Sequence, residues 1–470
     1  MGSSRGKQRQ QKIPKGNYLQ EEAVNTQGTG GGPSLSPART KETTREESCN
    51  NLMERVVARD NMLYALYRVE TNKGAAGIDG MTIESLRPFL KDQWPVIREQ
   101  LLKGTYQPKP VRRVEIPKPD GGTRLLGIPT VIDRLIQQAL LQKMNDIFEP
   151  TFVPFSFGFR PHKRAHSAVE LAREYIKEGY RWVVDMDLEK FFDKVNHDIL
   201  MSKVARRIQD KRVLLLIRRY LQAGVMVNGC CIATGEGTPQ GGPLSPLLAN
   251  IMLNELDLEL CRRGHRFVRY ADDCNIYVKS RRAGERVMAS VKKFVEERLK
   301  LKVNMQKSAV DRPWKRKFLG FSFTWDKEPK IRIAPKTKKR FMDKIRELTN
   351  RSKSQSMNKR IKAINTYIVG WIGYYRLADT RSVFQSLDEW LRRRLRMCYL
   401  KQWKKPKTKR KKLVALGIPP EWAMLISASR KGYWRLSNTP QVNKALGLAF
   451  WQEQGLKSLV ERYNELRSTT

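Results

Sequence analysis

Acidic residues are scarce in this chain of 470 residues, and the shortage points to its partner. Lys and Arg number 91 against 47 Asp and Glu, so the formal net charge is +44. Charge of one sign at this level destabilises a compact chain by self-repulsion unless a polyanion neutralises it. Nucleic acid is therefore the expected partner, with contacts to many phosphates.

Long apolar runs and paired cysteines are also missing. No run of 18 or more apolar residues occurs, and the N-terminus lacks a hydrophobic signal region, so neither a membrane span nor secretion is expected. The six cysteines show no C-x-x-C spacing, which argues against a zinc site and for reduced thiols in an intracellular protein. We expect a cytoplasmic protein with no membrane partner.

The order of the expected elements indicates an α+β fold. Residues 1–48 are polar and rich in Gly and Ser, so we expect them to be disordered. After them, amphipathic helices and short strands follow one another without a βαβ repeat. Residues 327–412 hold 28 Lys or Arg against 6 Asp or Glu, on two amphipathic helix patterns. A solvated basic face is the ordinary interpretation, but a sustained excess with interleaved aromatic residues favours a nucleic-acid cradle.

Two hairpins and a buried strand carry the residues of chemical interest. Residues 112–131, RRVEIPKPDGGTRLLGIPTV, place Pro-Asp-Gly-Gly between apolar strands, which predicts a tight hairpin. Residues 267–278, FVRYADDCNIYV, predict a second hairpin with two acids at its turn. Residues 181–195, RWVVDMDLEKFFDKV, predict a buried strand that runs into a helix, and a further strand is expected at 301–304.

The acids at the second turn, Asp272 and Asp273, have two explanations. Asp suits turns for local reasons, which is the ordinary one. Alternatively, they join Asp187 at the end of the buried strand, and divalent cations offset a cluster of carboxylates that is costly to bury. Two Mg²⁺ ions about 3.5–4 Å apart activate a hydroxyl and stabilise a leaving pyrophosphate during nucleotidyl transfer. Asp185 shares a face with Asp187 in a regular strand, so the residues alone leave its role open.

Eight motifs in order show that the chain resembles bacterial group II intron-encoded reverse transcriptases with maturase activity, in the compact class that lacks an endonuclease domain. The resemblance covers about residues 51–440. The motifs are NKGAAGIDG, RRVEIPKPDGGTRLLGIPTVIDRLIQQAL, SFGFRP, DMDLEKFFDKVNH, GTPQGGPLSPLLANIMLNELD, RYADD, LKVNMQKS and KFLGFSF. The resemblance implies a right-hand polymerase, with fingers and an antiparallel palm sheet, followed by an α-helical thumb or maturase domain.

The resemblance also implies the metal site. Asp187, Asp272 and Asp273 match the metal-binding acids of the family's palm, and Leu188 is placed with them in the metal-binding set. Two Mg²⁺ ions are implied, for which Mn²⁺ can substitute.

A nucleotide pocket is implied as well. With Asp187 rather than Asp185 as the ligand, Phe192 falls at the family's steric gate, where a ring clashes with a ribose 2′-hydroxyl and favours deoxynucleotides. A core aromatic is the alternative for Phe192. The other pocket residues are Lys118 and Arg124 for the incoming triphosphate, Gln240 as a lining residue, and Lys307 near the primer end or the triphosphate.

The implied domains are an N-terminal extension with fingers at 49–180, a palm at 181–326, a thumb or maturase domain at 327–412, and a short DNA- or RNA-binding appendage at 413–470. Residues His162 and His166 are expected to contact RNA or solvent rather than metal, and the arginines of LRRRLR at 391–396 to lie on an outer helix face. The predicted nucleic-acid-binding residues are Arg160, His162, Lys163, Arg164, Arg392, Arg393, Arg394 and Arg396.

The implied function is RNA-directed DNA polymerisation together with assistance to intron splicing. The implied partners are group II intron RNA, an RNA template with a DNA primer, target DNA and dNTPs, in a cytoplasmic bacterial ribonucleoprotein that supports retrohoming by target-primed reverse transcription. Two alternatives remain: a retron-like or defence-associated reverse transcriptase, and a non-catalytic RNA-binding splicing cofactor. The long basic region after residue 327 argues against the first, and the intact acids argue against the second.

Overall fold

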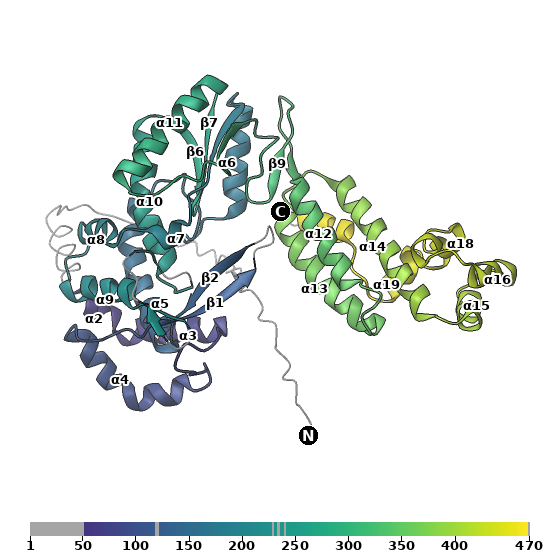
Figure 1. The fold of residues 1–470 in the computed structure, drawn as a ribbon, viewed down its shortest axis with the longest axis horizontal. Coiled ribbons are helices and arrows are strands. Elements are labelled where there is room, and N and C mark those ends of the chain that lie inside the picture. Colours follow the sequence, from purple (N-terminus) through teal and green to yellow (C-terminus); the bar gives the residue numbers. More distant parts are fainter. Residues whose placement is uncertain (1–50, 118–121, 228–229, 233–235, 239–240, 469–470) are drawn as a thin grey trace, which may run out of the picture. The chain divides into compact units, whose positions relative to one another are not determined.

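The computed structural model describes residues 51–117, 122–227, 230–232, 236–238 and 241–468, whose helices and strands are drawn in Figure 1. These residues form two compact units. The first unit contains the described residues up to Pro161 together with Leu188–Glu259 and Lys292–Val303. The second contains His162–Asp187, Leu260–Val291 and the described residues from Asn304 onward. The expected disorder of residues 1–48, and the positions of Lys118 and Gln240, lie outside the described residues.

The first unit is mainly helical and contains one four-stranded sheet in the order β2-β1-β4-β5. The predicted hairpin at 112–131 is confirmed, because β1 pairs antiparallel with β2 and Ile116 faces Arg124 across the ladder. The elements of this unit are α2 (Leu52–Val56), α3 (Arg59–Asn72), α4 (Leu86–Leu102), β1 (Val111–Pro117), β2 (Thr123–Ile128), α5 (Val131–Phe148), η1 (Glu149–Thr151), α7 (Phe191–Lys194), α8 (His197–Ala205), α9 (Lys211–Gln222), β4 (Val225–Val227), β5 (Cys230–Ile232) and most of α10 (Ser245–Arg262).

The second unit is built on an antiparallel sheet in the order β6-β7-β3-β8, which confirms the expected palm sheet. Its strands are β6 (Arg266–Tyr270), β7 (Asp273–Val278), β3 (Trp182–Met186) and β8 (Ala309–Asp311). Helix α6 (Ala165–Lys177) and the first part of α11 (Arg281–Arg298) pack against this sheet. Gly284 of α11 approaches so closely that a Cβ there would lie 2.5 Å from Val310. Helix α11 therefore covers the Val184 face, whereas Tyr175 of α6 packs against Tyr277, which shares the alternate face with Asp185.

The strand expected at 301–304 does not form. The chain there makes a single isolated bridge, between Leu188 and Val303, and β8 at Ala309–Asp311 is the strand that pairs with β3. Because β3 ends at Met186, Leu188 lies beyond it, and residues 301–304 have no regular strand to pair with there. A separate two-stranded ladder joins β9 (Phe321–Phe323) to β10 (Ile331–Ile333).

Long helices follow the sheet, and both predicted amphipathic stripes face their core. Ile361, Ile364, Ile368 and Trp371 are buried on α13, and the Phe341 and Trp371 rings lie 4.4 Å apart between centroids. On the next helix Leu387, Leu391, Leu395 and Cys398 are buried. The helices are α12 (Pro335–Leu348), α13 (Met357–Tyr375) and α14 (Arg381–Gln402), followed by α15 (Pro406–Ala415), α16 (Pro420–Ala428), α17 (Tyr433–Leu436), α18 (Pro440–Ala445), α19 (Leu448–Glu453) and α20 (Leu459–Ser468).

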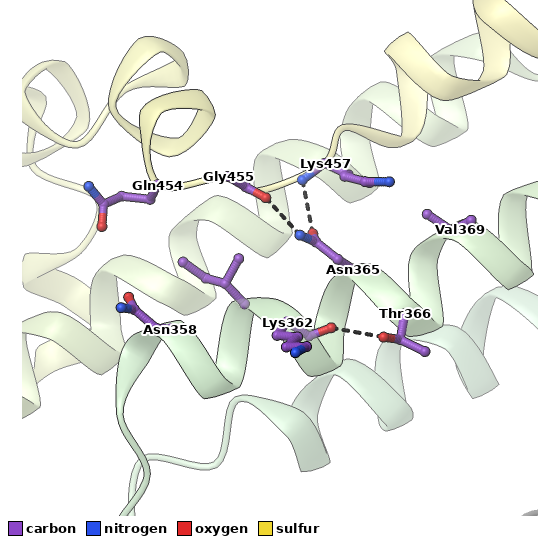
Figure 2. Close-up of a pocket in the computed structure, with 9 residues that line it drawn as sticks. Asn358, Lys362, Asn365, Thr366, Val369, Gln454, Gly455 and Lys457 are labelled. Carbon is purple, nitrogen blue, oxygen red and sulfur yellow. Dashed lines mark hydrogen bonds between the residues drawn. The ribbon is translucent and has the colours of Figure 1, made fainter.

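The C-terminal segment packs back onto these helices at two points. The Asp388 carboxylate of α14 accepts hydrogen bonds from the Leu459 and Val460 main chain and from the Ser458 hydroxyl, at the start of α20. Figure 2 shows the second point, where the Asn365 side chain donates to the Gly455 carbonyl and accepts from the Lys457 amide beside a cavity of about 510 Å³. The segment after α14 is therefore held in a fixed position on the helical core.

The helices in the described ranges do not form a membrane span. None of them combines the length and the apolar character that crossing a bilayer requires.

Candidate active site and nucleic-acid interface

The palm sheet brings the predicted acids to one face. Asp185 of β3 pairs with Asn275 of β7, and side chains two residues apart on a strand share a face. Asp187 and Asp273 therefore lie on the Asp185 face, and α11 packs on the other. Asp272 lies in the turn just before Asp273, so four carboxylates gather at this end of the sheet.

Negative charge is crowded at this end of the sheet. Surrounding protein and the carboxylates of Asp272, Asp185 and Asp187 raise the pKa of Asp273 to about 7, while Lys317 lowers it. A divalent cation would relieve this repulsion.

Asp185 has its own counter-ion. The Arg316 guanidinium donates from Nε to one Asp185 carboxylate oxygen at 2.8 Å and from Nη2 to the Lys307 carbonyl at 2.7 Å. Burial raises the pKa of Asp185, and the arginine opposes that rise. Asp185 is thus engaged with arginine, which agrees with the choice of Asp187 as the metal-binding acid.

The loop after β3 places Asp187 and Lys307 together. The Asp187 N–H donates to the Ser308 hydroxyl at 3.0 Å, and the Asp187 carbonyl accepts from the Asn304 N–H at 2.8 Å. The Lys307 ammonium lies 3.6 Å from an Asp187 carboxylate oxygen. Leu188, the remaining member of the predicted metal set, has a buried side chain without ligand atoms, so it can offer a metal only its main-chain carbonyl.

A hydrogen bond from Arg269 holds the hairpin tip that carries Asp272. Ala271 has a φ of +56°, a left-handed conformation that costs free energy for a residue with a Cβ. The guanidinium of Arg269, which is 0% exposed, donates to the Ala271 carbonyl at 2.7 Å. This bond fixes the backbone from which both hairpin acids project.

The donor set suits a hard divalent cation, although it is not a closed cage. Within the described residues, no three Asp, Glu, His or Cys side chains converge tightly enough to form a complete metal centre. Mg²⁺ needs only one or two protein carboxylates, because waters and substrate phosphates supply the rest. The all-oxygen donors and the crowded charge at Asp273 therefore fit magnesium that binds with its substrate.

The Arg316–Asp185 pair yields a stability prediction. Arg316→Gln leaves the half-buried Asp185 carboxylate without its guanidinium, so we expect the free energy of unfolding to fall by about 1–3 kcal/mol. Asp185→Asn in the same chain removes the unpaired charge and should restore most of that loss, as measured by thermal or chemical unfolding. Arg281→Gln, which breaks an exposed pair with Glu285, is the control and should change stability little. Equal destabilisation of the single and double variants would contradict the pairing.

The predicted gate residue lies in the first unit and is anchored through its main chain. Phe192 is half-buried in α7, its ring 5.2 Å from Phe191 between centroids, and its carbonyl accepts the Thr238 N–H at 2.6 Å. Gly237, at a φ of +95°, approaches this carbonyl so closely that a Cβ there would lie 3.0 Å from it. The loop leading to the predicted Gln240 is thus fastened to the gate segment, while Arg124 is exposed on β2.

The structure contradicts the predicted contact between Arg160 and the template. Arg160 is buried, and its guanidinium donates to the Glu149 carboxylate and to the Val153 and Ser156 carbonyls. Its donors stabilise the loop instead of facing a phosphate.

The basic residues that follow differ from one another. His162 and Arg164 are exposed and Lys163 is half-buried, just before α6. His166 is half-buried: its Nε2 lies 2.6 Å from the Tyr374 carbonyl and its ring lies edge-on to Phe321, so only part of the side chain can meet RNA or solvent. Histidine in this segment thus serves packing at one position and remains accessible at the other.

The LRRRLR arginines are not all on an outer face, contrary to expectation. Arg396 is only 7% exposed and donates to the Ser437 and Leu446 carbonyls. Arg394 is half-buried and donates to the Thr349 hydroxyl, whereas Arg392 and Arg393 remain partly accessible. A helix of 22 residues that packs on several sides has too little free surface for every arginine.

Three positioning residues were missed by sequence reasoning: Arg316, Ser308 and Arg269. Ser308 and Arg316 act on a segment far away in the sequence, since Ser308 receives the N–H of Asp187 and Arg316 pairs with Asp185, whereas Arg269 acts on Ala271 two residues on. Their only sequence signal is a place within or beside an expected motif: Arg269 begins RYADD, Ser308 ends LKVNMQKS, and Arg316 precedes KFLGFSF.

Comparison with known proteins agrees with this geometry. Residues 116–323 match the family described as reverse transcriptase (RNA-dependent DNA polymerase), and residues 338–416 match the group II intron maturase-specific domain. Protein YkfC of Escherichia coli K12 is 36% identical over 280 residues, which cover 51% of this chain and 74% of that protein. The group II intron-encoded protein LtrA of Lactococcus lactis is 31% identical over 362 residues, which cover 63% of this chain and 60% of that protein.

The antiparallel sheet, its acid cluster and the matched polymerase domain define an RNA-directed DNA polymerase. The maturase-specific domain that follows narrows the class further. The chain belongs to the family of group II intron-encoded reverse transcriptases with a maturase domain.

Proposed function

We propose that the acids on the palm sheet carry out nucleotidyl transfer with two metal ions. Asp187, Asp272 and Asp273 would hold the ions, with the Leu188 carbonyl beside them. Two Mg²⁺ ions, or Mn²⁺ in their place, would supply positive charge that lowers the pKa of a primer 3′-hydroxyl and offsets charge on the leaving pyrophosphate. The observation that carries this proposal is the strand register, which gathers the acids at one end of the sheet, on the face opposite α11.

The other predicted pocket residues act on the nucleotide itself. Lys118 and Arg124 would hold the triphosphate, and Gln240 would line the pocket. Phe192 would exclude a 2′-hydroxyl, and its anchored main chain supports a fixed ring position. Lys307 would contact the primer end or a phosphate, because its ammonium is exposed and held beside Asp187.

We further propose that the chain binds group II intron RNA, assists its splicing, and supports retrohoming by reverse transcription primed from target DNA. The proposed organisation is fingers at 49–180, palm at 181–326, maturase domain at 327–412 and a nucleic-acid-binding segment at 413–470. Support comes from the sustained positive charge of the maturase helices and from the similarity of the chain to LtrA, a group II intron-encoded protein. Extension of an oligo(dT) primer on poly(rA), together with an intron-splicing assay, tests both halves.

A salt titration tests the RNA-binding half. We expect Arg392, Arg393 and Arg394, changed together to Gln, to weaken RNA binding and to flatten the log–log salt dependence by up to about three contacts, roughly 0.7–0.9 each. Addition of one nucleotide to a preformed primer should change less, because the palm acids are untouched. Binding isotherms between low and moderate salt supply both affinity and slope.

The matched control removes three cations that already have acidic partners. Arg281, Lys293 and Arg462 lie four or three residues from Glu285, Glu297 and Glu465, respectively. Their joint change to Gln should leave affinity and slope near the parent values. An equal effect of the two triple variants would mean that net charge alone, and not this surface, governs RNA binding.

A further inference from the structure

Six cations surround three aromatic rings where the maturase helices meet the C-terminal segment. We propose that Trp390, Tyr433 and Trp434 hold these cations as a preformed surface for a nucleic-acid phosphate backbone. We call this the ring-held surface, and it rests on the proposed binding of RNA. Its cations are Arg346, Arg351, Arg393, Arg394, Lys401 and Lys409.

The indole rings hold the arginines of two helices. The Arg393 guanidinium carbon lies 3.9 Å from the Trp434 ring centroid, and its Nη2 donates to the Trp434 carbonyl at 3.3 Å. Arg394 lies 5.9 Å from both Trp390 and Trp434, and Arg346 of α12 lies 5.6 Å from Trp390. Contacts of this length allow attraction between a cation and the negative face of the ring.

Tyr433 gathers cations from three other segments. Arg351, which follows α12, lies 5.9 Å from the ring centroid, while Lys401 of α14 and Lys409 of α15 lie at 5.6 and 5.7 Å. A phenol ring that is surrounded by three cations cannot serve as an ordinary core aromatic. It fixes side chains that would otherwise repel one another.

The positive charge of this surface is not neutralised. Within the described residues, Arg351, Arg393, Arg394 and Lys401 make no ion pair and are at least partly accessible. Lys409 also makes none there but is only 5% exposed, so it adds positive charge without direct contact, and Arg346 is paired with Asp343. Burial lowers the pKa of Arg394, and the nearby Arg346, Arg351 and Arg360 lower it further. A carboxylate would fix these side chains and cancel their charge, whereas a ring fixes them and leaves the charge available. Such a surface suits an extended polyanion that contacts several cations at once.

The rings themselves are held in place by the rest of the fold. Arg396 donates to the Ser437 carbonyl just after α17, and hydrogen bonds at Asp388 fasten the chain farther along. Asn365 fastens it at a further point, which Figure 2 shows. Arg396 is therefore a positioning residue for the ring-held surface. Its burial, which disagrees with direct phosphate contact, is explained by this role.

The test changes rings and leaves every charge in place. Tyr433→Leu with Trp434→Leu should weaken binding of intron RNA by about 5- to 30-fold, because several cation–ring contacts of about 0.5–1 kcal/mol are lost. The salt slope should stay near the parent value, since the cations remain. Tyr433→Phe keeps the ring and should bind as the parent does. Trp422→Leu is the matched control and should leave the affinity for intron RNA unchanged. Trp422 is 47% exposed and has no cation over its ring in the described residues.

A double-mutant cycle covers the case in which the double ring variant fails to fold. Arg351 is exposed, so Arg351→Gln is a mild change, and its effect on RNA affinity should shrink at least twofold in a Tyr433→Leu background. Additive effects would overturn the proposal, as would parent-like affinity of the folded ring variants or a loss with Tyr433→Phe. Parallel titrations with intron RNA and with duplex DNA identify the polyanion: a fall in RNA affinity supports the proposal, and a fall with duplex DNA alone overturns it. If the Arg392–Arg394 variant loses RNA affinity while the ring variants do not, this inference fails and the proposed function stands.

Discussion

Changing Asp272 and Asp273 together to Asn should abolish DNA synthesis and leave RNA binding largely intact. The two carboxylates would hold the metal ions, and loss of several kcal/mol of transition-state stabilisation lowers the rate by about 10³-fold or more. Asn keeps the size of the side chain, so the strained turn held by Arg269 should persist. The measurements are primer extension on poly(rA)/oligo(dT) and the affinity for intron RNA, with thermal unfolding as a check on folding.

Asp185→Asn is the matched control for this pair. Asp185 lies on the same face of the sheet as Asp273, and its variant loses one carboxylate charge where the pair loses two, but the Asp185 carboxylate is paired with Arg316. We expect this variant to retain primer extension within about tenfold of the parent, because no metal contact is lost. Comparable activity of the Asp272/Asp273 variant and the Asp185 variant would refute the assignment of the metal-binding acids.

Local patterns were enough to predict the parts of the fold that short-range interactions determine. The hairpin around Pro-Asp-Gly-Gly formed where glycine allows the turn, and the hairpin with Asp272 formed between two apolar runs. The stripes ending at Trp371 and Cys398 faced a helical core because their spacing matches the helix period. Each of these features depends on residues that are neighbours in the sequence.

Features that depend on distant partners could not be predicted in this way. Asp185 and Asp187 look alike in the sequence, and the structural difference between them is Arg316, which is 131 residues from Asp185. The LKVN run at 301–304 resembles a strand, but the partner strand ends before it can pair. Composition and periodicity contain no information about either event.

The arginines show that the same limit applies when function is predicted from sequence. Arg160 and Arg396 were predicted to bind phosphates from their basic surroundings, and both are buried with their donors on carbonyl oxygens. Arg393, from the same run as Arg396, lies instead over an indole ring and has no acidic partner in the part of the chain that the structure describes. Sequence therefore gives the sign and amount of charge on these helices, and tertiary packing decides which cations remain available to nucleic acid.

Replacing Phe192 with Val should weaken discrimination between dNTPs and rNTPs. Removing the ring relieves the proposed clash with the ribose 2′-hydroxyl, and contacts of this size are worth about 10- to 100-fold in relative incorporation. The main-chain bond from Thr238 to the Phe192 carbonyl does not need the side chain, so the segment should keep its place. Incorporation of dNTP and rNTP by the same template and primer, expressed as a ratio of kcat/KM values, measures the effect.

Phe191→Val separates a gate from a core aromatic. Phe191 is buried and its ring lies against that of Phe192, so its truncation should lower the free energy of unfolding by about 1–3 kcal/mol and leave the dNTP/rNTP ratio unchanged. Phe192→Val should show the opposite pattern, since its ring is only half-buried and less packing is lost. If Phe192→Val lowers stability as Phe191→Val does and the ratio stays at the parent value, then the Phe192 ring is a packing residue and sugar selection must reside elsewhere in the pocket.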